Sequence, residues 1–248
     1  MIALSVNVNK VATLRNSRGG TSPSVLEAVE VCLKAGVQGI TVHPRADQRH
    51  ITPADVHQIA EVLTHSPRRV EFNIEGDPRP DLLALVHAVV PTQCTLVPVV
   101  PGEVTSHKGW TPGPEADRLA GVIADLKSQG IRVSLFVSPT IEAIRLASTL
   151  GADRVELYTE PFARAFERGR DEGRLSFEAY VRSAELAGAL GLGVNAGHDL
   201  DLHNLVLFRT LPNLAEVSIG HAIVSRAVFF GLGYVVQEYL TVLGGARS

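Results

Sequence analysis

Polar residues able to transfer protons or bind anions follow several of the apolar, strand-like segments of this chain. These segments end in Asn7-Val8-Asn9-Lys10, His43-Pro44-Arg45, Asn73-Ile74-Glu75-Gly76, Asn195-Ala196-Gly197-His198 and Gly220-His221. Imidazole and carboxyl groups act as general acids and bases, whereas arginine and the N-terminus of a helix bind phosphate. Because catalytic groups of α/β barrels lie at the C-terminal ends of the strands, we expect these side chains to form one site.

Three of these residues, His43, Glu75 and His198, are candidate proton-transfer groups. A histidine titrates near neutral pH, although His43 taken alone fits an acid/base role and a structural hydrogen bond equally well. Strand alternation places Glu75 on the same side as Glu71 and Asn73. Since a buried carboxylate needs partners, Glu75 is either a general base near cations or one half of a buried ion pair.

His198 lies between a flexible glycine, Gly197, and Asp199. Asp199 either orients the imidazole or caps the following helix, and we expect the capping role. Two histidines and a glutamate are also ligand types that zinc accepts. A metal site made of His43, His198 and Glu75 therefore stays open on ligand type alone.

One predicted loop carries three basic groups, among them Arg45 and His50, with Asp47 available to orient one of them. Arginine holds phosphate or carboxylate through two parallel hydrogen bonds. In the last strand-to-helix junction, Gly220 and His221 are suited to phosphate binding at the helix start, although a plain tight turn also explains Gly220.

The first predicted loop adds two more cations. Lys10 either contacts a phosphate or forms a Schiff base, for which a desolvated lysine is required. Arg18, followed by Gly19-Gly20, is a second candidate for anion binding, but these glycines match no nucleotide-binding loop. Two separate anion sites indicate two phosphorylated reactants or one bisphosphate.

Composition limits the class of protein. The chain has 248 residues, of which 45% are hydrophobic, so it is expected to form a large core. The net charge of -3 gives no positive field for nucleic acid. Cys32 and Cys94 lie in apolar runs far apart, which predicts buried thiols. Neither a signal-peptide pattern nor a membrane span is found, which favours a cytoplasmic location.

Strand-like runs alternate with helical patterns along the whole chain. The strand-like runs are Leu4–Val8, Gly39–Val42, Val70–Ile74, Thr95–Pro98, Arg132–Val137, Arg154–Leu157, Leu192–Asn195 and Glu216–Ile219. The helical patterns are Val25–Lys34, a segment that opens with Thr52 and Pro53, and Pro80–Val90, Pro114–Gln129, Pro139–Leu150, Phe177–Leu190, Leu202–Thr210 and His221–Leu243. This alternation predicts an α/β fold, a single (β/α)₈ TIM barrel over residues 1–248, with a doubly wound sheet as the alternative.

Two connections are longer than a plain loop. Val99–Pro114 is rich in proline and glycine, and we expect a mobile loop over the site there. Thr159–Leu175 is charged and predicts an extra short helix. The apolar stripe of the last helix is expected to face the core. Its members are Val235, Val236, Tyr239 and Leu240.

Taken together, the motifs resemble those of the pyridoxine 5′-phosphate synthase family over nearly the whole chain. The segments that carry the resemblance are Ala12–Gly19, Gly39–Arg45, Arg49–Thr52, Asn73–Glu75, Gly130–Phe136, Asn195–His198 and Ile219–Ala222. The resemblance implies a barrel with extra helices, a homo-octamer, and no metal or organic cofactor. It also implies condensation of 3-amino-2-oxopropyl phosphate with 1-deoxy-D-xylulose 5-phosphate to pyridoxine 5′-phosphate, inorganic phosphate and water.

The same resemblance implies roles for individual residues. His43 and His198 match acid/base histidines, Glu75 matches the catalytic carboxylate, and Glu156 matches a group that stabilises the transition state. Asn7 and Arg18 match positions that hold the amino-ketone phosphate. The matches for deoxyxylulose phosphate are Arg45, His50 and Thr105, and those for a phosphate-binding turn are Gly220 and His221.

The chain differs from the family pattern at three of its substrate-binding positions. Asn9-Lys10 stands where many members have Asp-His, in contact with deoxyxylulose phosphate, and Asp199 stands where many have glycine. The first change removes a carboxylate and replaces an imidazole with a permanent cation. Because His43, Glu75 and His198 are present, we interpret the chain as a synthase with altered substrate contacts.

Two other functions fit the same residues less well. Another phosphosugar barrel enzyme, an aldolase or isomerase, would act on one phosphorylated substrate without an amine. A non-catalytic sugar-phosphate sensor would bind without turnover and would not need the acid/base groups.

Overall fold

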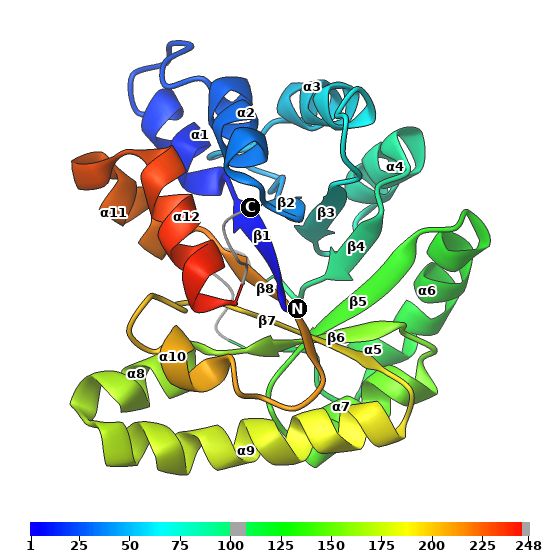
Figure 1. Ribbon diagram of the computed structural model, residues 1–248. Coiled ribbons are helices and arrows are strands. Elements are labelled where there is room, and N and C mark those ends of the chain that lie inside the picture. Colours follow the sequence, from blue (N-terminus) through cyan, green and yellow to red (C-terminus); the bar gives the residue numbers. More distant parts are fainter. Residues whose placement is uncertain (100–107, 245–248) are drawn as a thin grey trace.

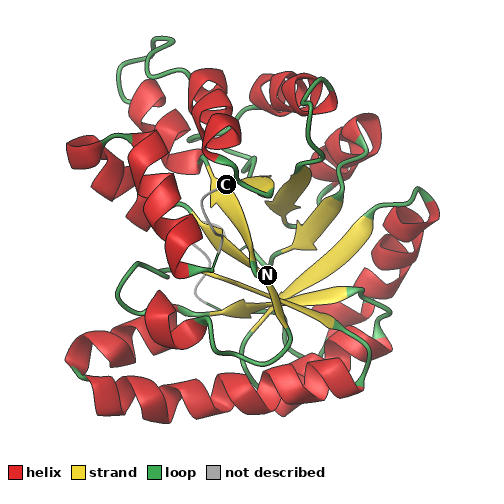
Figure 2. Cartoon of the chain, in the orientation of Figure 1, coloured by secondary structure: helices red, strands yellow, loops and turns green. Residues whose placement is uncertain are grey.

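Eight parallel strands form a closed barrel at the centre of the molecule, and helices surround it (Figures 1 and 2). This computed structural model describes residues 1–99 and 108–244. The strands follow one another in chain order, and β8 pairs with β1 to close the barrel. The predicted (β/α)₈ class is confirmed, and the alternative of an open doubly wound sheet is wrong.

The strands lie close to their predicted positions. They are β1 Ala3–Asn7, β2 Gly39–Val42, β3 Glu71–Gly76, β4 Gln93–Leu96, β5 Arg132–Val137, β6 Arg154–Tyr158, β7 Gly193–Gly197 and β8 Leu214–Ile219. The bounds of β2 and β5 are those predicted, whereas β4 begins and ends two residues earlier than expected.

The described helices are more numerous than the predicted ones. They are α1 Asn9–Asn16, α2 Val25–Ala35, α3 Pro53–Thr64, α4 Pro80–Val89, α5 Pro114–Asp117, α6 Leu119–Ser128, α7 Ile141–Thr149, α8 Glu160–Arg168, α9 Arg170–Ala189, α10 Leu205–Phe208, α11 His221–Phe230 and α12 Leu232–Val242. The extra helix expected between β6 and α9 is present as α8.

Three predictions about helices were wrong, and in the first of them the helix predicted over Pro114–Gln129 is divided at Arg118 into α5 and α6. The segment after β1 was expected to be a loop, but it forms α1, which buries only Val11 and Ala12 and so lacks a clear apolar pattern. The last predicted helix is interrupted at Gly231, whose φ of 83° is left-handed, and this residue separates α11 from α12. The apolar stripe of α12 is buried as expected.

The interior of the barrel is lined by polar side chains. Asn73 donates to Thr41 and accepts a hydrogen bond from Thr95, which links β2, β3 and β4 along one face. Asn195 on β7 donates across the barrel to Gln93 on β4 at 3.4 Å, so this face points inward. The alternate positions, such as the fully buried Ile40 and Ile74, therefore face the surrounding helices.

The extra helices are anchored to the C-terminal end of β6. The rings of Phe162 on α8, Tyr180 on α9 and Phe208 on α10 pack together with centroids 5.1–5.9 Å apart. The Tyr180 hydroxyl donates to the backbone oxygen of Tyr158 at 2.8 Å. This cluster fixes the end of β6.

Both cysteines are buried free thiols, as predicted. Burial raises the pKa of Cys32 and of Cys94 to about 12, so each remains a thiol at neutral pH. Within residues 1–99 and 108–244, every helix is too short or too polar to cross a lipid bilayer.

Candidate active site

A cavity of about 370 Å³ opens at the C-terminal ends of the barrel strands. It brings together side chains that were predicted from separate sequence motifs. These are Asn7, Asn9, Lys10, His43, Arg45, His50, Glu75, Glu156, His198, Asp199, Gly220 and His221. The expectation that the strand-end motifs form one site is met, whereas their chemical roles remain predictions.

Two predicted site residues are not placed in the cavity. Arg18 is exposed beyond the end of α1, and it is absent from the described residues that line the cavity. Thr105 and half of the predicted loop Val99–Pro114, residues 100–107, lie outside the described residues.

His43 is a buried base at the end of β2. Its backbone N–H donates to Asn9 Oδ1 at 3.0 Å, and its Nδ1 lies 3.9 Å from Glu75 Oε2. Its Nε2 has no hydrogen-bond partner among the described residues. Burial, together with electrostatic repulsion from His50 and Arg45, lowers the pKa of His43 to about 3. The imidazole is therefore uncharged at neutral pH.

Glu75 is a buried carboxyl group that lies beside His43 at the cavity. Burial and the nearby charges of Glu156 and Glu216 raise the pKa of Glu75 well above its ordinary value. Burial therefore favours the protonated form of Glu75 beside an uncharged imidazole. Such a pair can pass a proton between a substrate atom and either group.

Glu156 on β6 is a second buried carboxyl at the cavity, with 4% of its surface exposed. Its Oε2 has no hydrogen-bond partner within the described ranges. A Cβ at Gly197 on the neighbouring strand would lie 2.4 Å from Glu156 Oε1, so glycine leaves the space that this carboxyl occupies. Burial and the charge of Glu216 raise the pKa of Glu156 to about 8, which makes it a proton donor at neutral pH.

His198 is held in a strained turn after β7. His198 and Asp199 have φ values of 89° and 58°, which non-glycine residues rarely adopt. Thr159 donates to the backbone oxygens of Gly197 and His198 and fixes this turn. This turn places His198 at the cavity.

Asp199 orients His198. Its Oδ2 lies 3.4 Å from His198 Nδ1, and the interaction with His198 holds the pKa of Asp199 below its ordinary value. The expectation that Asp199 caps the next helix was wrong. Asp201 instead accepts the backbone N–H groups of the residues just before α10.

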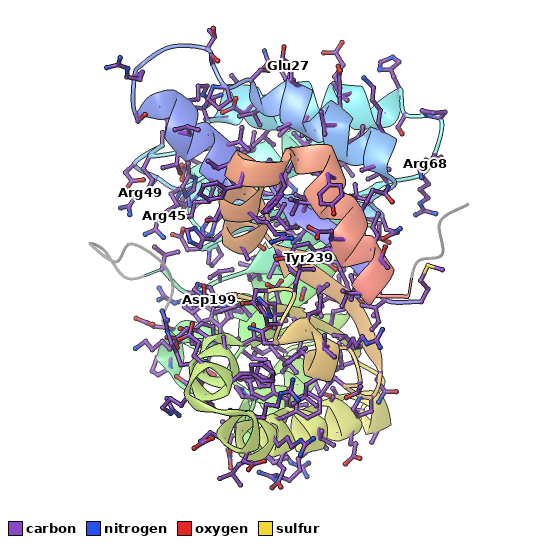
Figure 3. All side chains as sticks on the ribbon, turned by 60° about the vertical axis from the view of Figure 1, so that its left-hand side comes forward. Glu27, Arg45, Arg49, Arg68, Asp199 and Tyr239 are labelled. Atoms are coloured by element: carbon purple, nitrogen blue, oxygen red, sulfur yellow. The ribbon has the colours of Figure 1, made fainter. Side chains whose placement is uncertain are left out.

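Positively charged groups form the mouth of the cavity. Arg45, Arg49 and Asp199 lie on the same side of the molecule, and Arg68 lies on the opposite side (Figure 3). Burial and the charges of Arg45, Lys10 and Arg49 lower the pKa of His50 to about 4. This electrostatic effect favours a bound anion.

Two details of the mouth refine the predicted anion sites. Asp47 pairs with Arg49 at 2.7 Å, so Arg49 is the basic residue that it orients. Lys10 lies exposed in the first turn of α1, which does not provide the desolvation that a Schiff-base lysine needs.

Gly220 brings the start of α11 to the cavity. A Cβ at this position would lie 2.8 Å from the backbone oxygen of Asn7, so only glycine permits the close approach. Gly220, His221 and Ala222 all line the cavity. The first N–H groups of α11 are therefore available to an anion, as predicted for this junction.

The loop that carries His50 is held by α1. Arg15 donates to both oxygens of Asp55 at 2.5 and 3.0 Å and to the His50 backbone oxygen at 3.3 Å. Asn16 donates to the same oxygen at 2.9 Å. Asp55 also forms the capping box of α3 with Thr52. This network positions the basic loop relative to the barrel.

Replacing Arg15 with alanine is expected to lower the free energy of unfolding by about 3 kcal/mol, because the buried Asp55 carboxylate loses its partner. Urea unfolding followed by circular dichroism measures this. The matched control is Arg182→Ala on α9, which removes an exposed pair with Glu178 and should cost less than about 0.5 kcal/mol. Equal losses in the two variants would contradict the structural role of Arg15.

Sequence reasoning missed the apolar wall of the cavity. Val97 and Phe136, at the ends of β4 and β5, line the cavity and form a small cluster with Tyr158. The Tyr158 ring lies 5.1 Å from the ring of His198, centroid to centroid. Apolar residues in a strand resemble core residues, so their sequence contains no chemical signal.

In the described part of the chain, no three histidine, cysteine, aspartate or glutamate side chains are grouped so as to hold a metal ion.

Comparison with known proteins identifies close relatives of this sequence. Residues 4–245 match the family described as pyridoxal phosphate biosynthesis protein PdxJ. A protein of Christiangramia forsetii named pyridoxine 5′-phosphate synthase is 48% identical over 98% of this chain and 100% of its own. A protein of the same name from Leptospira biflexa is 47% identical over 98% of this chain and 97% of its own.

Solved structures with a similar fold have much lower sequence identity. Phosphoribosylanthranilate isomerase from Thermotoga maritima has a TM-score of 0.58 and 13% identity, covering 99% of this chain and 100% of its own. The YdjI aldolase from Escherichia coli K12 has a TM-score of 0.63 and 12% identity, and the match covers 98% of this chain and 91% of the aldolase chain. At these identities the likeness concerns the barrel fold alone.

Proposed function

The chain belongs to the family of the pyridoxal phosphate biosynthesis protein PdxJ, and on that premise we propose that it is a pyridoxine 5′-phosphate synthase. It is an enzyme of vitamin B6 biosynthesis. The reactants proposed are 3-amino-2-oxopropyl phosphate and 1-deoxy-D-xylulose 5-phosphate, and the products are pyridoxine 5′-phosphate, inorganic phosphate and water. The proposed enzyme is a cytoplasmic homo-octamer.

One observation carries this proposal: a single cavity contains an uncharged imidazole, two buried carboxyl groups with raised pKa values and a cationic mouth. His43 provides the imidazole, and Glu75 and Glu156 are the carboxyl groups. Condensation of an amine with a ketone needs both proton acceptors and proton donors. Phosphorylated reactants in turn need positive charge at the entrance.

The proposed chemistry uses these groups in sequence. The amine nitrogen attacks the ketone carbon, and a protonated carboxyl donates to the carbonyl oxygen as the C–N bond forms. Loss of water then gives an imine, and His43 removes protons from carbon or nitrogen as phosphate leaves and the ring closes. Each positioned acid or base contributes about 10²–10⁴-fold to the rate.

His198 is proposed as the second acid/base histidine. Its orientation by Asp199 and by the turn after β7 gives it one fixed direction into the cavity. A fixed donor or acceptor avoids the entropy cost of finding the reactive geometry. The aromatic edge of Tyr158 restricts the ring further.

The reactants are proposed to bind through their phosphate groups. Arg45, His50 and Lys10 at the mouth hold deoxyxylulose phosphate, with Asn9 beside them. Gly220-His221 at the start of α11 and Asn7 hold the amino-ketone phosphate. Binding roles for Arg18 and Thr105 are proposed on the family resemblance alone, since Arg18 does not line this cavity and Thr105 lies outside the described residues.

The alkaline side of the pH profile is expected to reflect Glu156. With the amine saturating, kcat/KM for deoxyxylulose phosphate should decrease above about pH 8, because Glu156 must carry its proton to donate it. Initial rates between pH 6 and 10 at constant ionic strength measure this decrease. A rate that keeps rising through this range would contradict a protonated Glu156 in the free enzyme.

The function is tested by incubating the purified chain with deoxyxylulose 5-phosphate and freshly prepared 3-amino-2-oxopropyl phosphate. Absorbance and mass spectrometry should show pyridoxine 5′-phosphate together with one equivalent of inorganic phosphate. Turnover of either reactant alone would instead indicate an aldolase or isomerase. Binding of deoxyxylulose phosphate without any product would indicate a sensor.

A further inference from the structure

Four charged residues lie in the barrel beneath the cavity, and we call them the floor cluster: Arg132, Arg154, Glu71 and Glu216. Arg154 Nη1 lies 3.6 Å from Glu216 Oε2, and Arg132 Nη2 lies 4.0 Å from the same oxygen. Arg132 also donates to Glu71. Glu216 is 3% exposed, and it does not line the cavity as the described residues define it.

Neutral side chains hold the two arginines in place. Arg132 Nε donates to Gln93 Oε1 at 2.8 Å, and Arg154 Nη1 donates to Asn195 Oδ1 at 2.8 Å. Asn195 in turn donates to Gln93. The positive charges therefore have fixed positions inside the barrel.

The floor cluster contains two cations and two carboxyl groups. Burial alone would raise the pKa of Glu71, but the hydrogen bond from Arg132 holds it below its ordinary value, so Glu71 is ionised. Glu216 is the second carboxyl next to the arginines. Arg132 pairs with Glu71 and both arginines lie beside Glu216, whereas among the described residues no cation lies within ion-pair distance of Glu156.

Glu156 lies in the same row of the sheet as Glu216. Glu156 pairs in register with Asn195, and Asn195 pairs in register with Glu216, so one strand separates the two carboxyl residues. Their backbones are about 10 Å apart at the usual spacing of strands. Both are buried, so water screens their interaction only weakly.

We propose that Glu216 is a positioning residue for the reaction: its carboxylate, held by Arg154 and Arg132 below the cavity, keeps Glu156 in its proton-bearing form. The inference rests on the proposed function, in which Glu156 donates a proton. Glu216 itself touches no reactant. The arginines thus stabilise the negative charge on Glu216, and that charge favours the protonated form of Glu156.

The ion pairs of Glu216 support this assignment. Arg154 and Arg132 lie beside Glu216 and favour its ionised form against the effect of burial. Burial and the charge of Glu216 together raise the pKa of Glu156. The negative charge of Glu216 therefore opposes ionisation of Glu156.

The other groups around this pair are accounted for. The ionisable groups around Glu216 and Glu156 are Arg154 and Asp153 at the start of β6, Arg132 on β5, Arg69 just before β3, Glu71 and Glu75 on β3, and His43 and His198 at the ends of β2 and β7. The inward side chains of the remaining strands are neutral at these levels. They are Ser5, Thr95 and Asn195.

Infrared difference spectroscopy of the protonated carboxyl band tests the proposal independently of activity. Glu156→Gln identifies the Glu156 band, which in the wild-type protein should disappear with a midpoint of about pH 8. In Glu216→Gln the midpoint should fall by at least about one pH unit, because a like charge is lost and two cations are left unbalanced. An unmoved or higher midpoint in the folded variant would overturn the proposal.

Two further measurements apply if Glu216→Gln does not fold. Glu216→Asp keeps the charge and should keep the wild-type midpoint, so a decrease like that of the glutamine variant would count against the proposal. The wild-type titration needs no change at Glu216, and an ionised Glu156 at pH 7 would overturn the proposal by itself. Glu178→Gln on the exposed face of α9 is the control.

Activity separates this inference from the proposed function. If the alkaline limb of kcat/KM moves to lower pH together with the infrared midpoint, both are supported. If the midpoint is shifted in Glu216→Gln but the wild-type protein has no synthase turnover, the placement of the proton is supported and the proposed function is overturned. Synthase turnover with an unshifted midpoint overturns the inference alone.

Discussion

Replacing Glu75 with glutamine is expected to lower kcat for pyridoxine 5′-phosphate formation by about 10²–10⁴-fold. The side chain keeps its size and can still donate a hydrogen bond, but it can no longer give up a proton. Because burial favours the uncharged forms of both Glu75 and His43, the change is not expected to break an ion pair. Steady-state kinetics should therefore show a lost kcat with little change in KM.

The control for Glu75 is Glu30→Gln, the same change on the exposed side of α2. It should leave kcat and the unfolding midpoint unchanged, since isolated surface substitutions have small effects. The Glu75 variant should be at least as stable as the wild-type protein, because a buried carboxyl is replaced by a neutral amide. Near-normal turnover in a folded Glu75→Gln protein would remove Glu75 from the proposed proton transfers.

Replacing His43 with asparagine is expected to lower kcat by a similar factor, about 10²–10⁴-fold. Asparagine retains a polar group at the end of β2, and the backbone N–H of residue 43 still donates to Asn9 Oδ1. What is lost is the only neutral imidazole that lies beside Glu75 among the described residues. Single-turnover measurements should locate the loss in the chemical steps rather than in binding.

The matched control is His65→Asn at the end of α3, where the ring is exposed. Its kinetics should equal those of the wild-type protein. A His43→Asn, Glu75→Gln double variant should lose little more than either single variant, because the two groups act as a unit. Losses that multiply would show that His43 and Glu75 serve separate steps.

Much of the fold was predictable because its signals are local. The alternation of apolar strands with amphipathic helices predicted the barrel, and the bounds of β2 were correct. Asn9–Asn16 was missed as a helix because it buries only two residues, and α11 was joined to α12 because a single glycine separates them. A local signal fails where tertiary packing, rather than periodicity, stabilises a helix.

The location of the candidate site was predictable for a similar reason. Alternation along β3 places Glu71, Asn73 and Glu75 on one face, and in the barrel these occupy the floor, the interior and the cavity. Side-chain direction on a strand repeats every two residues, so it can be inferred from the sequence alone. Asp199 shows the limit, because orienting an imidazole and capping a helix have the same local signature.

The residue pattern by itself therefore determined the barrel, the rim on which the candidate site lies, and most residues of the cavity. Only the tertiary structure decided the protonation of those residues and the exclusion of Arg18 from this cavity. It also joined Glu216 to Arg154, residues that are far apart along the chain. The reason is physical: periodicity is a property of neighbouring residues, whereas a pKa depends on burial and on charges that strand register brings together.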